Sequence, residues 1–283
     1  MNALMFLVIF LIVLTLIGVG IYLYLYQFLF KKPQNSPQKF ISKPKNRQRI
    51  VFAGDSLTCG NMSADYTKLV ENSLGNEYEY INAGINADLS YNLLSRLEEI
   101  IACNPDYITI LIGTNDANAT LNKRNKEIYQ KLKNLPHPPS LFEYEENLQN
   151  IILQLRVHTQ AKIALISMPV LGEDLQDKKH QHLYEYIMVL KRVAEKNDIG
   201  YLPFYERHRA YLEQRTSKPK KNKEEHKLIE MSMLQRYIFG RSWDAISKTH
   251  GFLTQTDYIH LNGWGAKNIA QLIENWVRKS KQD

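Results

Sequence analysis

The sequence predicts an α/β protein: a three-layer α/β/α sandwich around a mostly parallel five-stranded sheet, preceded by an N-terminal transmembrane helix. Three observations lead to this class. Residues 1–30 carry no charged side chain. After residue 48, short apolar runs alternate with longer stretches of helical periodicity, which is typical of repeated βα units. Several of the apolar runs end in Gly, Asn, Asp or Ser, at the points where parallel sheets carry functional side chains.

The segment 1–30 is expected to anchor the chain in a lipid bilayer through residues 3–30. As a helix this stretch would be about 42 Å long, more than the ~30 Å hydrocarbon core of a membrane. A cleaved signal peptide is the alternative. It requires a basic start, a shorter apolar core and a small-residue cleavage site, and the sequence has none of these. Three tyrosines near the end of the segment suit the membrane interface: Tyr22, Tyr24 and Tyr26.

The positive charge of the chain is concentrated directly after this anchor. The segment 31–54 has no acidic residue and seven basic ones: Lys31, Lys32, Lys39, Lys43, Lys45, Arg47 and Arg49. Subtracting these seven from the 36 Lys and Arg leaves 29, equal to the 29 Asp and Glu. The remainder is therefore formally neutral, which gives no support to nucleic-acid binding.

We expect residues 31–48 to form an extended basic linker, which either lies on anionic headgroups or is a solvated flank of the anchor. The positive-inside rule favours a cytoplasmic position for the domain that follows, although an exported domain is the alternative. That domain is expected to cover residues 49–283.

Strands and helices alternate along this domain. Strands are predicted at 49–53, 78–82, 107–112, 162–167 and 199–204. Helices are predicted at 66–74, 91–103, 142–158, 183–196 and 265–278. Two insertions, near 117–140 and 207–255, follow strand ends, so they are either lids over a site or surface decoration. The second contains a basic run, 218–223.

The first predicted strand ends in Gly54, Asp55 and Ser56, followed by a helical pattern. Such a turn lifts the Ser56 hydroxyl to the carboxyl end of the sheet. A serine hydroxyl is a poor nucleophile unless the fold supplies a base, a group that orients the base, and donors for an oxyanion.

Three later segments offer those parts. Residues 80–88 run from a strand into a small-residue turn that can present backbone N–H groups. Residues 110–116 contain Gly113, which allows close approach, and Asn115, which has an amide donor. Residues 256–262 contain Asp257 three positions before His260, a spacing that lets a carboxylate face an imidazole.

The motifs Gly54-Asp55-Ser56-Leu57, Gly113-Thr114-Asn115-Asp116 and Asp257-Tyr258-Ile259-His260 resemble those of GDSL-type esterases and lipases of the SGNH hydrolase superfamily. The resemblance covers roughly residues 48–280 and implies a flavodoxin-like sheet and serine esterase chemistry without metal or cofactor. By position, it implies Ser56 as nucleophile, His260 as general base and Asp257 as the residue that orients His260. The implied oxyanion donors are the Ser56 N–H and the Asn115 side chain.

A third oxyanion donor is less obvious. In the family, an Asn is followed, in the turn after the second strand, by a glycine whose N–H is an oxyanion donor. Asn82 matches that Asn, and Ala87 falls at the position of the glycine. The Ala87 N–H is therefore the expected third donor, and the Gly84 N–H is the alternative. Alanine suffices if the backbone there is not one that only glycine tolerates. Asp55 and Asp116 are expected to brace their turns by hydrogen bonding.

The expected function is membrane-anchored hydrolysis of a small-molecule or lipid carboxylic ester, of the acyl ester or lysophospholipid type. The alternatives are a deacetylase or acyltransferase acting on glycans or envelope polymers, and an inactive membrane-tethered binding module. The other histidines, such as His180, His182 and His208, are expected at the surface rather than in a metal site. No pattern in the chain indicates an oligomeric state.

Overall fold

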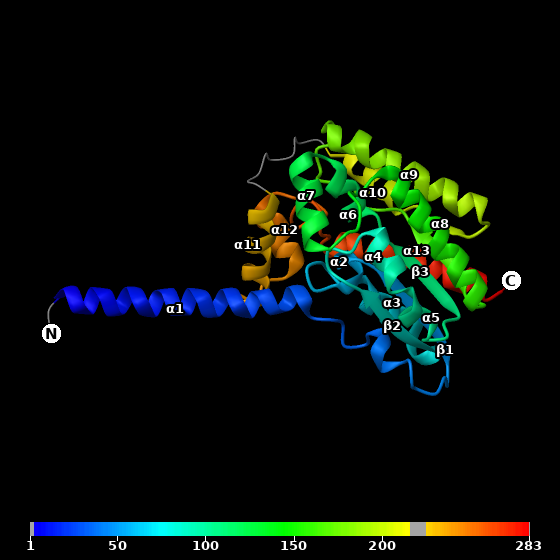
Figure 1. The fold of residues 1–283 in the computed structure, drawn as a ribbon, viewed down its shortest axis with the longest axis horizontal. Coiled ribbons are helices and arrows are strands. Elements are labelled where there is room, and N and C mark those ends of the chain that lie inside the picture. The colour runs from blue at the N-terminus through cyan, green and yellow to red at the C-terminus, as the bar shows by residue number, and fades with distance from the viewer. Residues whose placement is uncertain (1–2, 216–224, 283) are drawn as a thin grey trace.

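A computed structural model describes residues 3–215 and 225–282. Its centre is a five-stranded sheet in which all neighbouring strands are parallel, in the order β2-β1-β3-β4-β5 (Figure 1). The strands are β1 (Gln48–Gly54), β2 (Tyr78–Gly84), β3 (Tyr107–Leu111), β4 (Lys162–Ile166) and β5 (Gly200–Leu202). This is the predicted five-stranded parallel sheet.

Alternate residues of each strand point to opposite faces of the sheet, and helices cover both faces. In β1, Val51 and Ala53 belong to one buried cluster, while Ile50 and Phe52 belong to another. The helices over the first face are α4 (Ser90–Ser95), α5 (Leu97–Ile101), α8 (Leu141–His158) and α9 (Lys178–Lys196). The helices over the second face are α3 (Tyr66–Leu74) and α13 (Gly263–Ser280).

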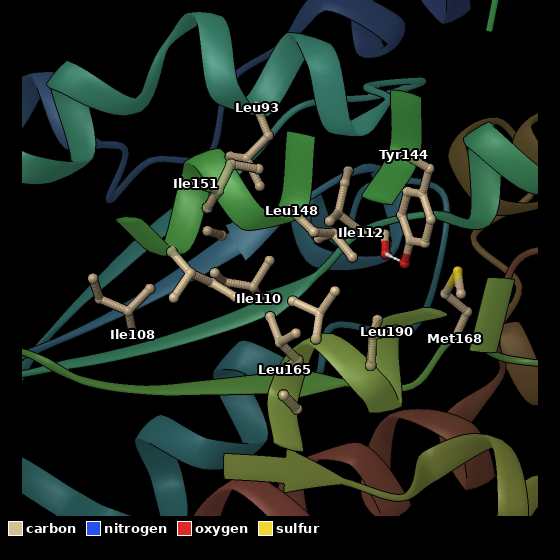
Figure 2. Close-up of a cluster of buried hydrophobic side chains, with 14 of the residues drawn as sticks. Leu93, Ile108, Ile110, Ile112, Tyr144, Leu148, Ile151, Leu165, Met168 and Leu190 are labelled. Carbon is tan, nitrogen blue, oxygen red and sulfur yellow. Dashed lines mark hydrogen bonds between the residues drawn. The ribbon is translucent and has the colours of Figure 1, made fainter. Parts of the chain in front are cut away.

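Figure 2 shows the first of these clusters, where side chains of α4, α8 and α9 meet those of β3 and β4. Tyr144 of α8 is fully buried, and its hydroxyl donates a hydrogen bond to the carbonyl of Ile112, just beyond β3. A helix is thus tied to the strand end that leads into Asn115.

Three predicted elements differ most from those observed. The helix predicted over 183–196 begins five residues earlier, at Lys178. The single helix predicted over 91–103 is split into α4 and α5, because Arg96 leaves helical geometry with φ −118° and ψ 19°. The guanidinium of Arg96 instead donates to the carbonyls of Gly54 and Ala83 at the ends of β1 and β2. The fifth strand is shorter than predicted because Phe204 already begins α10 (Phe204–Glu213).

The N-terminal segment forms a single exposed helix, α1 (Ala3–Phe30), which projects from the domain (Figure 1). Residues Leu4–Phe30 are long and apolar enough to cross a membrane. The segment 31–48 is not extended as predicted: it packs on the domain around the short 3-10 helix η1 (Pro37–Lys39). Asn35 pairs with the free edge of β2 through Tyr80 and Asn82, which protects that edge.

Both predicted insertions contain helices. The first holds α6 (Thr114–Thr120) and α7 (Lys123–Leu132), and the second holds most of α10, α11 (Glu225–Tyr237) and α12 (Trp243–His250). The basic run 218–223 lies outside the described residues. The remaining short elements are α2 (Ser56–Cys59) and the 3-10 helix η2 (Gly75–Glu77).

A buried ion pair joins the start of β1 to β2. Arg49 Nε lies 2.7 Å from Glu79 Oε2, and Arg49 is only 2% exposed. The same guanidinium donates to the carbonyls of Cys103 and Lys43, so that its charge is hydrogen-bonded on several sides. Removing one partner of such a pair leaves an unpaired buried charge.

We therefore predict that Glu79→Gln destabilises the fold by about 3 kcal/mol. Thermal unfolding of the detergent-solubilised protein would show the midpoint falling by roughly 5–10 °C. Lys43→Met is the matched control: Lys43 also pairs with Glu79, but its side chain is half exposed, so its loss should cost little. Equal shifts in the two variants would contradict the prediction.

Candidate active site

The carboxyl ends of three neighbouring strands carry the predicted site residues. Ser56 follows β1, Ala87 follows β2, and Asn115 follows β3 as the second residue of α6. Since β2, β1 and β3 are adjacent and parallel, their ends meet at one edge of the sheet. Asp257 and His260 come from a later segment, 251–262, which leads into α13.

Ser56, His260 and Asp257 form a buried chain of hydrogen bonds. Ser56 Oγ lies 3.0 Å from His260 Nε2, and His260 Nδ1 lies 2.9 Å from Asp257 Oδ2. All three residues are at most 4% exposed. The other carboxylate oxygen of Asp257 accepts the N–H groups of Ile259 and His260, each at 2.8 Å.

This arrangement sets the proton positions. Burial alone would raise the pKa of Asp257, but the adjacent His260 and the N–H groups of the same turn hold that pKa below its usual value. An ionised Asp257 can only accept, so His260 Nδ1 carries a proton and donates it to Asp257. Nε2 is then an acceptor that faces the Ser56 hydroxyl.

Asp55 shapes the turn that presents Ser56. Its carboxyl group caps α2 by accepting the Leu57 N–H at 2.9 Å. Burial raises the pKa of Asp55 to about 7. Gly54 allows the close packing beneath this turn, because a Cβ there would lie 2.4 Å from the Leu111 carbonyl oxygen.

The geometry of the turn after β2 distinguishes between Gly84 and Ala87, the two candidates for the third oxyanion donor. The Gly84 N–H donates to Asn82 Oδ1 at 3.0 Å, and a Cβ on Gly84 would lie 2.2 Å from the Cys59 nitrogen, so this glycine serves close packing. Ala87 has a φ of 59°, in the left-handed region that costs a residue with a Cβ roughly 1–2 kcal/mol. Within the described residues, the Ala87 N–H has no hydrogen-bond acceptor.

The Asn115 side chain has three hydrogen-bond partners. Its Nδ2 donates to the Asp88 carbonyl at 2.9 Å and, more weakly, to Asp55 Oδ2 at 3.4 Å, and its Oδ1 accepts the Tyr129 hydroxyl at 2.8 Å. Gly113, with a φ of 122°, directs the chain into α6 under Tyr144. Asp116 accepts both the N–H and the hydroxyl of Ser90, and so braces the start of α4.

These groups open into one cavity of about 820 Å³. Ser56, Ala87, Asn115 and His260 line this cavity. The end of α1, α7 and Ile229 of α11 line it as well. The two insertions therefore border the cavity rather than lying elsewhere on the surface.

Sequence reasoning missed the residues that hold this site together. Tyr129 and Lys133 come from the first insertion; Lys133 pairs with Asp88 Oδ1 at 2.6 Å. Glu173 is buried, accepts the N–H groups of residues 253–255 and pairs with Arg215 at 3.0 Å. It thereby fixes the segment that carries Asp257 and His260. None of these residues has a local sequence signal, because their partners are distant in the chain.

The prediction that the other histidines lie at the surface was wrong for three of them: His180, His208 and His250, the last of which is 5% exposed at the end of α12. His208 is fully buried, and His180 is 7% exposed, because their helices turn these side chains inward. His208 bonds to Thr254 Oγ1 at 2.8 Å, and burial lowers its pKa to about 3, so it is neutral. No cluster of His, Cys, Asp and Glu within residues 3–215 and 225–282 could hold a metal ion.

Comparison with known proteins identifies the family of this chain. The profile of the GDSL-like lipase/acylhydrolase family matches residues 52–228. An acetylxylan esterase of Geobacillus stearothermophilus is 26% identical over 172 residues, which are 53% of this chain and 73% of that protein.

Solved structures share the fold at lower identity. The crystal structure of the acetyl xylan esterase AlAXEase superposes with a TM-score of 0.58 at 18% identity, covering 81% of this chain and 99% of that one. The hydrolase LAE5, from the metagenome of Lake Arreo in Spain, gives a TM-score of 0.56 at 16% identity over 80% of this chain and 93% of its own. The chain belongs to the GDSL-like lipase/acylhydrolase family of the SGNH hydrolase superfamily and is an ester-hydrolysing enzyme of that family.

Proposed function

We propose that this esterase works through an acyl-enzyme, with Ser56 as nucleophile, His260 as general base and Asp257 as the residue that orients His260. The observation that carries the proposal is the continuous hydrogen-bond chain from Ser56 Oγ through His260 to Asp257, in which Ser56 and His260 line the cavity. His260 Nε2 takes the hydroxyl proton while Ser56 Oγ attacks the ester carbonyl. The same proton then goes to the leaving alcohol as the tetrahedral intermediate collapses.

Water completes the cycle. His260 Nε2 removes a proton from the water that attacks the acyl-enzyme, and returns that proton to Ser56 Oγ as the carboxylic acid leaves. The ionised Asp257 stabilises the imidazolium that forms in both steps. We propose that the oxyanion is held by the N–H groups of Ser56 and Ala87 and by Asn115 Nδ2, all of which border the cavity.

For the substrate, we propose an acyl ester amphiphile with an anionic headgroup, of the lysophospholipid type. The apolar side chains of the cavity suit an acyl chain: Leu29, Phe30, Met62, Ile85, Ile128, Leu132, Ile229 and Ile259. Four cationic residues also border it: Lys31, Lys32, Arg124 and Lys133, of which Lys133 is paired with Asp88. No carboxylate of the described residues lines the cavity. This combination favours a ligand that is apolar at one end and negatively charged at the other.

We further propose that α1 anchors the enzyme in a membrane, that residues 31–48 connect it to a catalytic domain over 49–283, and that this domain faces the cytoplasm. The length and apolar character of Leu4–Phe30 support the anchor. The basic residues that follow support the orientation.

A second candidate is the removal of acetyl groups from carbohydrates. The relatives named as acetylxylan esterases favour it. An acetyl ester of a sugar would leave most of the apolar lining of this cavity unused. The preferred acyl chain length therefore separates the two candidates.

We predict that Ser56→Ala loses at least about 1,000-fold of the activity against p-nitrophenyl esters and no longer reacts with a fluorophosphonate probe. Ser95→Ala is the matched control, since Ser95 is exposed on α4 and should be neutral. Labelling of the wild-type protein also excludes an inactive binding module. Activity that persists in Ser56→Ala would refute the mechanism.

Ala87→Gly should stabilise the protein by up to about 1 kcal/mol, because glycine removes the cost of the positive φ. Activity should stay within about twofold, since the backbone N–H remains. Ala83→Gly, in the regular part of β2, serves as the control and should be destabilising. Thermal unfolding and ester hydrolysis measure both quantities. A large loss of activity in Ala87→Gly would contradict the expectation that this residue contributes only its backbone N–H.

The proposed substrate class predicts rates that rise from acetyl to long-chain esters, and a preference for palmitoyl-lysophosphatidylglycerol over the zwitterionic choline analogue. The double variant Lys32→Gln/Arg124→Gln should raise KM for the anionic lipid by about 3–10-fold at low salt, and less at high salt. Lys123→Gln, on α7 but outside the cavity lining, is the control. Hydrolysis of acetyl esters alone would instead support the deacetylase.

A further inference from the structure

We propose that the last turn of α1 is part of the substrate-binding cavity, and that the mouth of this cavity lies at the headgroup level of the bilayer, so that the ester enters from the membrane. The inference rests on the proposed function, a membrane-anchored enzyme that acts on an acyl amphiphile. It adds a second role to the anchor, which would supply a wall of the site.

The end of α1 is fixed to the domain. The ring of Phe28 stacks on Tyr237 of α11 with centroids 3.8 Å apart. Two carbonyl groups of the last turn, where the helix itself provides no N–H partner, accept hydrogen bonds from side-chain amides. The Phe28 carbonyl accepts one from Asn61 Nδ2 at 2.6 Å, and the Leu29 carbonyl accepts one from Asn86 Nδ2 at 2.9 Å. Phe28 and Leu29 also pack on a buried cluster that includes Met62, Met233, Trp243 and Ile246.

This docking brings α1 to the catalytic groups. Asn86, which holds the Leu29 carbonyl, directly precedes Ala87 in the turn after β2. Residues 29–32 line the same cavity as Ser56 and His260, together with α7 and Ile229 of α11. Deleting or displacing the end of α1 would therefore open one side of the cavity.

The length of α1 places the membrane surface beside this opening. Leu4–Phe30 has 27 residues, which as a helix span roughly 40 Å, while the hydrocarbon core takes about 30 Å. Three exposed tyrosines, Tyr22, Tyr24 and Tyr26, suit the interface and lie within two turns of Phe28. The domain then begins at the headgroups, and Lys31 and Lys32 lie at the level of the lipid phosphates.

One exposed apolar side chain on the domain fits the same level. Figure 1 shows α11 lying beside the C-terminal part of α1, and the two helices are in contact. Phe239 follows two residues after Tyr237 and is 67% exposed. A large aromatic side chain next to a membrane anchor is well placed to enter the interface.

The first test measures activity of the full chain in anionic nanodiscs. Tyr237→Ala removes the stack on Phe28, whereas Tyr237→Phe keeps the ring and loses only the hydrogen bond to the Asn61 carbonyl. We expect Tyr237→Ala to raise KM for palmitoyl-lysophosphatidylglycerol about 3–10-fold and to leave p-nitrophenyl acetate hydrolysis unchanged. Tyr237→Phe should resemble the wild type. An equal loss of activity on both substrates, or unchanged activity on both, would overturn the role of α1 as a cavity wall.

The second test does not depend on catalysis. Phe239→Trp in nanodiscs that contain brominated phospholipid should show more fluorescence quenching than the wild type. Val157→Trp is the control, because Val157 is 65% exposed at the far end of α8. Quenching equal to that of Val157→Trp would overturn the membrane-level mouth. Quenching of Phe239→Trp would support the position of the domain on the bilayer even if the wild type hydrolyses only acetyl esters. That second result would contradict the proposed substrate alone.

Discussion

The hydrogen bond between the Ser56 hydroxyl and His260 joins residues that are 204 positions apart in the chain. Neither residue is held by its own motif alone. Ser56 depends on β1 and on the Asp55 cap, and His260 depends on a segment that Glu173 and Ser63 hold in place. The turn after β1 and the segment that leads into α13 must therefore both be in place for the proposed nucleophile to meet its proposed base.

The donors around Asp257 give this hydrogen-bond chain its direction. Asp257 stays ionised because its turn surrounds it with donors, and it fixes the proton of His260 on Nδ1. The oxyanion donors that we propose come from three strand ends, and Ala87 among them has a left-handed backbone. This conformation places the Ala87 N–H at a cost in stability.

Much of the fold and the candidate site could be predicted from the sequence, because their signals are local. Apolar runs gave the five strands, and the motifs around Ser56, Asn115 and His260 pointed to residues that the structure brings together. The interactions of Tyr129 and Glu173 could not be predicted, since each depends on a partner far along the chain. The same holds for residues 31–48: only the structure shows Asn35 pairing with the edge of β2. The basic charge of this segment indicated only a linker.

The central claim is that Ser56 carries the acyl group during turnover. Rapid acid quenching during hydrolysis of palmitoyl-lysophosphatidylglycerol by the full chain in nanodiscs, followed by peptide mass spectrometry, tests it directly. The account predicts a palmitoyl group on the peptide that contains Ser56, formed before steady state and absent in Ser56→Ala. Product formation with no acyl group on Ser56, or with the group on another residue, would contradict it.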